Sequence, residues 1–309
     1  MHRTFVLPVF GLLALTIYFG INADNFLTVG NLLNIARDGA VLLIVAIGAT
    51  WVILMGSIDL SVGSVVTLAG LTSALAVESV PPAVAVLVGV LVGLGAGALN
   101  GLLFAYARVP SFLVTLGMSL ALAGAGLWIV GGRPVQVFSL EFLSLSTGTL
   151  VGTLPNIALW SFLIYGLAVV VAFRTRFGRF AYAIGGGEAV AQLSGVAVRR
   201  YKFYAMTVSG ALAGLAGVLL SARVGAATPA MGASLVLQSI AAVVMGGTAL
   251  TGGIGGVHRT IVGVLFITIL ANGLDVMGVN PYLQSIIQGA VVVGAVALTI
   301  DRTKLAVLK

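Results

Sequence analysis

The chain has 309 residues, of which 60% are hydrophobic and 7% are charged, whereas soluble domains carry about 25% charged residues. This composition excludes a water-soluble protein, and the long unbroken apolar runs exclude a membrane β-barrel, whose strands alternate polar and apolar residues. The net charge is +7. The charged residues lie in the short segments between the apolar runs, which argues against a nucleic-acid partner. We therefore expect an all-α, polytopic protein surrounded by membrane lipid.

Ten apolar segments along the chain approach the length of about 20 residues that a bilayer-spanning helix needs. They predict one transmembrane domain over residues 1–309 with about ten helices. The first segment lacks a convincing signal-peptide cleavage site, so we expect it to be retained as a span. Segments 60–77 and 235–250 are short and flanked by glycine, so each also fits a partial, re-entrant helix. Trp51, Trp128 and Trp160, near span ends, are expected to be interfacial anchors. The predicted spans are 5–21, 32–55, 60–77, 83–107, 111–130, 157–173, 203–222, 235–250, 260–277 and 283–300.

The basic residues predict the orientation of these spans, because cytoplasmic loops are enriched in lysine and arginine. Residues 174–202, between the sixth and seventh spans, carry six of them and are expected on the cytoplasmic side. With ten spans, both termini are cytoplasmic, and 12 basic residues lie inside against 3 outside, namely Arg37, Arg133 and Arg223. Spans two to five and seven to ten then run in opposite directions, as in an inverted repeat, although the two halves share little sequence similarity. The inside set is Arg3, Arg108, Arg174, Arg176, Arg179, Arg199, Arg200, Lys202, Arg259, Arg302, Lys304 and Lys309.

Catalytic chemistry has few candidate residues in this sequence. There is no cysteine, and the two histidines, His2 and His258, are far apart, so neither a thiolate site nor a clustered-histidine metal site is predicted. None of the three lysines completes a glycine-rich phosphate loop ending in Gly-Lys-Ser/Thr. We therefore expect no enzyme active site, no metal and no cofactor in this chain, and no ATP hydrolysis by the chain alone.

Polar residues inside the apolar segments are candidates for a solute path, because buried ionisable groups are costly in a membrane. Asp59 is expected to be the N-cap of the helix that follows it, with a substrate or gate contact as the alternative. Asp275 is expected to be an interfacial residue held by Asn272 or water, with the same alternative. Neutral polar side chains more often bond between helices than bind ligands, yet a path lined by amides and hydroxyls suits a neutral polyhydroxylated solute better than an ion. The candidate path residues are Asp59, Ser61, Gln238, Asn272 and Asp275; further neutral polar residues are Asn100, Thr115, Ser119, Gln284 and Gln288.

The cytoplasmic segment 174–202 contains a second candidate site. After three consecutive glycines, residues Glu188–Leu193 predict a short helix with a glutamate in its first turn, which Gly195 ends. A surface helix bracketed by glycines is typical of a docking element, although a solvated basic loop that obeys the positive-inside rule has a similar composition. The candidate docking residues are Gly186, Gly187, Glu188, Ala189, Leu193 and Gly195.

This segment resembles the coupling region of permease subunits in bacterial ABC importers for simple sugars, of the ribose, xylose and galactose type, which are related to branched-chain amino acid permeases. Other stretches are similar to the same family over nearly the whole chain. They are Asn25-Phe26-Leu27-Thr28 with Asn31-Leu32-Leu33-Asn34, Gly56-Ser57-Ile58-Asp59-Leu60-Ser61-Val62-Gly63-Ser64, Arg108-Val109-Pro110-Ser111-Phe112 with Thr115-Leu116-Gly117-Met118, Ile240-Ala241-Ala242-Val243-Val244-Met245-Gly246-Gly247-Thr248, and Asn272-Gly273-Leu274.

The resemblance implies a multi-pass permease domain in the bacterial cytoplasmic (inner) membrane that imports a sugar or sugar-like solute. It also implies a second permease copy or a related heteromeric partner, a tandem-domain ATPase that holds ATP and Mg, and a periplasmic sugar-binding protein. Family members often carry Glu-Leu-Asp where this chain has Val236-Leu237-Gln238, which fits a heteromeric pairing whose partner supplies the acids. The alternative is an ion-coupled secondary transporter of a small neutral solute. Such a transporter would normally place carboxylates at the membrane midplane, where only Asp59 and Asp275 are available.

Overall fold

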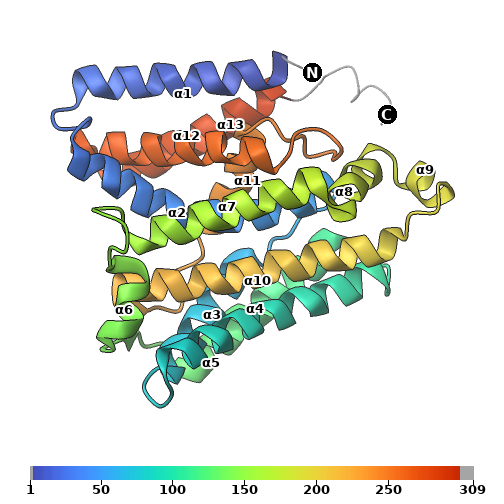
Figure 1. Ribbon diagram of the computed structural model, residues 1–309, viewed down its shortest axis with the longest axis horizontal. Helices are drawn as coiled ribbons and strands as arrows, with labels where there is room; N and C mark the ends of the chain where they lie inside the picture. The colour runs from blue at the N-terminus through green and yellow to red at the C-terminus, as the bar shows by residue number, and fades with distance from the viewer. Residues whose placement is uncertain (1–2, 300–309) are drawn as a thin grey trace.

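The computed structural model describes residues 3–299, so Arg302, Lys304 and Lys309 lie outside the described residues. The chain forms a bundle whose long helices have roughly aligned axes, although the chain direction differs from helix to helix (Figure 1). A short antiparallel ladder pairs β1 (Val135–Gln136) with β2 (Ala226–Ala227). Each predicted apolar segment coincides with one helix, up to the last described residue. These ten helices are α1 (Arg3–Asn22), α2 (Val29–Leu54), α3 (Val62–Ala76), α4 (Pro82–Ala105), α5 (Ser111–Val130), α7 (Asn156–Arg174), α10 (Val198–Val224), α11 (Leu235–Met245), α12 (Val257–Val276) and α13 (Pro281–Thr299).

Six of the described helices are long and apolar enough to cross a membrane, namely α2, α4, α5, α7, α10 and α12. By contrast, α3 has 15 residues and α11 has 11. At 1.5 Å per residue they are about 22 and 16 Å long, which is less than the hydrocarbon core of about 30 Å. We call α3 and α11 the half-helices, and they correspond to the two segments for which a partial helix was the alternative.

Several predicted helix boundaries are wrong. α3 begins at Val62 rather than at residue 60, α10 begins at Val198 rather than at 203, and α11 ends at Met245 rather than at 250. Hydropathy misplaces the start of α10 because Arg199, Arg200 and Lys202 are among its first five residues, so the helix begins before the apolar stretch. Three further helices complete the described chain, of which only the last was predicted: α6 (Leu140–Thr147), α8 (Arg176–Gly186) and α9 (Glu188–Leu193).

The core is built around α2, whose residues are continuously buried from Gly39 to Leu54. Trp51 is only 2% exposed, and its ring centroid lies 4.9 Å from that of Phe177 in an edge-on contact. The expectation that Trp51 is an interfacial anchor is therefore wrong, because α2 is enclosed by other helices. Trp128, by contrast, is 87% exposed on the outside of the bundle.

Glycines bring α4 and α10 into direct backbone contact. A Cβ atom added at Gly93 would lie 2.3 Å from the carbonyl oxygen of Gly210, and one added at Gly210 would lie 2.3 Å from the carbonyl oxygen of Gly93. Gly97 and Gly214 extend this contact along the two helices. Close approach through small residues replaces the hydrophobic driving force that helices in lipid lack.

The two halves of the chain pack in a similar way. α10 packs against α3 and α4, and α2 packs against α11 and α12. Likewise α3 contacts α5, and α11 contacts α13. The half-helices meet where a Cβ atom at Gly63 would lie 2.5 Å from the carbonyl oxygen of Gly232, and one at Gly232 would lie 2.2 Å from that of Gly63. The beginnings of the two half-helices therefore lie together inside the bundle.

Candidate functional site

A non-helical stretch of residues 55–61, which we call the re-entrant segment, connects α2 to the first half-helix. The backbone N–H of Ile58 donates to Ser111 Oγ at 3.3 Å, and that of Leu60 donates to Thr115 Oγ1 at 3.1 Å. Buried irregular backbone is tolerated where protein groups satisfy its donors and acceptors. The hydroxyls of α5 therefore hold the re-entrant segment in place, and Thr115 bonds to this segment rather than to a neighbouring helix.

Asp59 lies at the centre of a buried hydrogen-bond cluster. Its Oδ1 accepts from the Ser61 backbone N–H at 2.9 Å and from Ser61 Oγ at 2.6 Å, and its Oδ2 accepts from Ser209 Oγ at 3.1 Å. Asn100 Nδ2 donates to Ser61 Oγ at 2.8 Å. All four residues are at most 5% exposed, so the cluster joins the start of α3 to α4 and α10.

The N-cap explanation of Asp59 is wrong in its geometry. The N-cap of α3 is Ser61, whose side chain makes no capping hydrogen bond. Asp59 lies two residues earlier and accepts from Ser61 itself rather than from the N–H groups of the first turn. Sequence analysis missed Ser209 altogether, because one serine among the small residues of a long helix carries no distinguishing signal.

The second half-helix continues the polar region. The Gly232 backbone N–H donates to Thr67 Oγ1 at 3.1 Å, which ties the approach to α11 to α3. Gln238 lies half-buried in the first turns of α11, and its neighbour Leu237 is 71% exposed. The structure therefore brings Asp59 and Ser61 together and places Gln238 on the adjoining half-helix.

The two remaining path candidates lie apart from this cluster. Asn272 forms a reciprocal amide pair with Asn31, with Nδ2 to Oδ1 distances of 2.8 and 2.9 Å, and so links α12 to α2. This is the interhelical hydrogen bond that is the more common role of such residues. Asp275 is exposed near the end of α12.

The second candidate site, the docking segment, contains the short helix expected from the sequence. α9 spans Glu188–Leu193, and Gly195 adopts a φ of +81° directly after it. Ala191 is buried, whereas Val190 is 69% and Leu193 is 90% exposed. α9 projects beyond the other helices at one end of the bundle (Figure 1).

The glycines before α9 do not all form a linker. α8 runs through Gly186, and the helix is interrupted only at Gly187. A Cβ atom at Gly185 would overlap the carbonyl oxygen of Leu54 and would lie 2.3 Å from the nitrogen of Gly253. This contact joins α8 to the end of α2, where the re-entrant segment begins.

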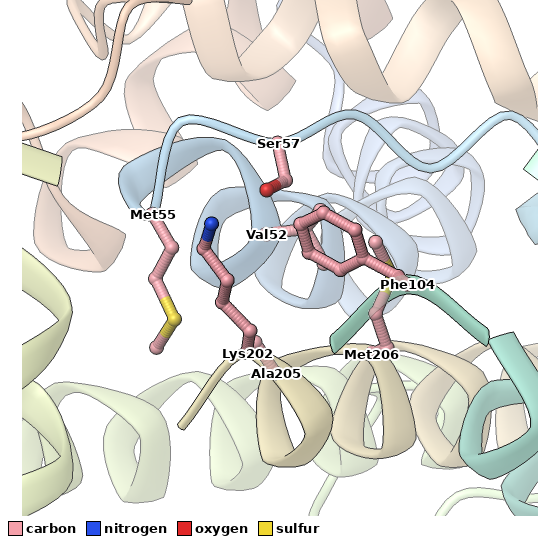
Figure 2. Close-up of a pocket in the computed structure, with 7 residues that line it drawn as sticks. All are labelled: Val52, Met55, Ser57, Phe104, Lys202, Ala205 and Met206. Atoms are coloured by element: carbon pink, nitrogen blue, oxygen red, sulfur yellow. The ribbon is translucent and has the colours of Figure 1, made fainter. Parts of the chain in front are cut away.

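Lys202 connects α9 to the same region. Its Nζ lies 2.6 Å from Glu188 Oε2 and 4.9 Å from the ring centroid of Phe104, and its side chain is only 12% exposed. Figure 2 shows Lys202 extending from α10 toward the re-entrant segment, beside Met55 and Ser57. The sequence had identified Lys202 only as one basic loop residue.

A bundle with six helices apolar and long enough to cross a membrane, with half-helices that meet within it, fits a membrane transport protein of the permease class. Within residues 3–299 no group of three or more metal-binding side chains occurs. Residues 31–296 match the family described as "Branched-chain amino acid transport system / permease component". The chain belongs to this family and is a permease subunit of an ABC importer.

Three relatives illustrate the similarity. The probable ABC transporter permease protein YphD of Escherichia coli is 39% identical over 94% of this chain and 87% of that protein. The ribose import permease protein RbsC of Bacillus subtilis is 37% identical over 96% and 92%. The D-allose transport system permease protein AlsC of E. coli is 34% identical over 91% and 87%. No solved structure matches the chain.

Proposed function

We propose that the chain carries a sugar or sugar-like solute across the bacterial cytoplasmic membrane. The family description names branched-chain amino acids, whereas two of the relatives above are named for ribose and allose. Asp59 is the one charged side chain that is buried within the described bundle, and its carboxylate already accepts hydrogen bonds from the hydroxyls of Ser61 and Ser209. A zwitterionic amino acid would need countercharges in the membrane interior, whereas a sugar needs only hydrogen-bond partners. The neutral interior therefore favours the sugar.

The proposed topology has ten membrane-inserted helices in a single permease domain, 1–309, with both termini in the cytoplasm. The distribution of basic residues supports it, and α1 begins at the same end of the bundle as α8 and α9 (Figure 1). The matched packing of α2 with α11 and α12, and of α10 with α3 and α4, supports an inverted repeat of the kind common in transporters. The half-helices are then equivalent elements that enter the membrane from opposite sides.

In this proposal a tandem-domain ATPase docks on α9. The ATPase binds ATP and Mg, because this chain has no phosphate loop. The exposed Val190 and Leu193 of α9 are the observation that carries this assignment. Two contacts can transmit a movement of α9 to the re-entrant segment. One is the Glu188–Lys202 ion pair, and the other is the contact of Gly185 in the adjoining α8 with Leu54 at the end of α2. ATP hydrolysis on the partner is thereby coupled to the half-helices.

A second permease copy, or a related heteromeric partner, completes the solute path, and a periplasmic sugar-binding protein delivers the solute. The half-helices adjoin an exposed surface that includes Leu237, which fits a path shared between two subunits. Among the path candidates, Ser61 lies two residues before Gly63 and Gln238 lies in the first turns of α11, so both belong to the half-helix region. Asn272 and Asp275 contribute to the outer part of the path only if the Asn31 pair opens.

Reconstitution into proteoliposomes tests this function. The chain is combined with the ATPase and the binding protein of the same importer, and uptake of labelled ribose and allose is measured. We expect uptake to require ATP and to be insensitive to a protonophore; sensitivity to the protonophore would instead indicate the ion-coupled secondary transporter. Replacing Ala189 with arginine should uncouple ATP hydrolysis from uptake without changing the amount of inserted protein. Thr149→Arg, at an exposed position near the other end of the bundle, is the control and should leave the ATPase bound.

A further inference from the structure

A groove of about 740 Å³ opens at the end of the bundle that carries α9. The last residues of α4 and the turn that follows it form one side, from Phe104 to Pro110. Glu188 and Gln192 of α9, together with the first turn of α10, form the other side. Most of the lining residues are exposed, so the groove is open to water.

The charge of this groove is strongly positive. Arg108 lies on one side, and Arg199 and Arg200 lie on the other. None of the three forms an ion pair with another residue in the range 3–299. The carboxylate of Glu188, which also lines the groove, is already paired with Lys202. Three uncompensated guanidinium groups therefore face one open groove.

The position of Arg108 is itself unusual. Its φ is +59°, in the left-handed region where glycine is favoured and a longer side chain strains the backbone. The turn is held by the Val109 backbone N–H, which donates to the Leu103 carbonyl at 3.2 Å. Glycine would make this turn with less strain, so the turn geometry alone does not account for an arginine here. Strained residues of this kind cluster at functional sites.

We propose that this groove is a second docking surface for the ATPase subunit and that it receives an acidic segment of that protein. The inference rests on the proposed function, which assigns the ATPase to α9. Because Glu188 and Gln192 line the groove while Val190 and Leu193 are exposed on the same short helix, a partner that covers α9 also reaches the groove. Guanidinium groups pair with carboxylates in directional, charge-assisted hydrogen bonds.

An anionic lipid headgroup carries the same charge as an acidic protein segment, but the geometry favours a protein. One wall of the groove is α9, which projects beyond the ends of its neighbouring helices (Figure 1). A protein segment is oriented by its other contacts on α9 and can keep its carboxylates close to the arginines.

Charge reversal of the groove tests the proposal. The full-length permease is placed in phosphatidylcholine nanodiscs, and the affinity of the importer's purified ATPase is measured at several salt concentrations. We expect Arg199→Glu and Arg108→Glu each to weaken binding about tenfold, or about 1.4 kcal/mol, and to flatten the salt dependence. Arg133→Glu, also exposed but beyond the other end of α5, should bind like the unmodified chain. Replacing an acidic residue of the ATPase by arginine should restore binding to the Arg199→Glu variant.

Each other outcome overturns the groove proposal in a recognisable way. If Ala189→Arg weakens ATPase binding but the two groove variants do not, docking on α9 stands and the groove plays no part. If the groove variants matter only when phosphatidylglycerol is added to the nanodiscs, the groove binds lipid. If neither Ala189→Arg nor the groove variants change binding, the proposed docking of the ATPase on α9 fails as well.

Discussion

Replacing Gly63 with alanine tests whether the half-helices have to touch. The added Cβ atom would lie 2.5 Å from the carbonyl oxygen of Gly232 and 2.6 Å from Cγ2 of Val236. Real Cβ contacts essentially never fall under 3.0 Å, so the two backbones would have to separate by at least about 0.5 Å in a close-packed interior. The Gly232 oxygen belongs to the backbone and cannot rotate away. Overpacking of this kind costs about 1–3 kcal/mol.

Two measurements follow the effect of this substitution. Thermal unfolding of the purified permease in detergent should show a loss of stability in that range. If the substitution destabilises only one of the two transport states, ATP-driven uptake per inserted permease should fall by about 5- to 150-fold. Gly95→Ala in α4 is the matched control, because a Cβ atom there meets nothing within 4 Å, and it should keep both properties. Gly63→Leu should be more severe than Gly63→Ala. Normal uptake together with normal thermal stability in Gly63→Ala would refute the reasoning.

Three further substitutions test the polar residues. Asp59→Ala removes the acceptor shared by the N–H and hydroxyl of Ser61, so we expect a loss of about 2–4 kcal/mol in thermal unfolding; an unchanged melting temperature would contradict the cluster. Asn272→Leu should cost about 1–3 kcal/mol because it leaves Oδ1 of Asn31 without a donor, while Nδ2 keeps its bond to the Phe26 carbonyl, and adding Asn31→Leu should recover part of this loss. Strictly additive effects in that double-mutant cycle would argue against the pair. Gln238→Leu should weaken uptake by less than about tenfold, as the loss of one hydrogen-bond partner does, whereas near-complete loss would indicate a single strongly held binding site.

Hydropathy and composition were sufficient for the class of protein and for the six described helices that are long and apolar enough to cross a membrane. A helix that enters lipid has to be apolar along its length, so the signal is local and can be counted along the chain. The glycines around Glu188–Leu193 also indicated α9 correctly, because helix ends depend on nearby residues. Hydropathy did not predict α6 and α8, because these helices are too short or too polar to form apolar runs.

Tertiary packing established the arrangement of the candidate site. Asp59 and Ser209 are 150 positions apart, and they meet because glycines bring α4 and α10 together and because the re-entrant segment leads inward beside α10. In the same way, Asn272 meets Asn31 at a separation of 241 positions, which gives a path candidate an interhelical partner. The sequence predicts Lys202 only as one of six basic residues in a loop, whereas in the structure it lies between α9 and the re-entrant segment. Hydrogen bonds between distant residues depend on where whole helices cross, and the hydropathy of a single segment contains no information about that crossing.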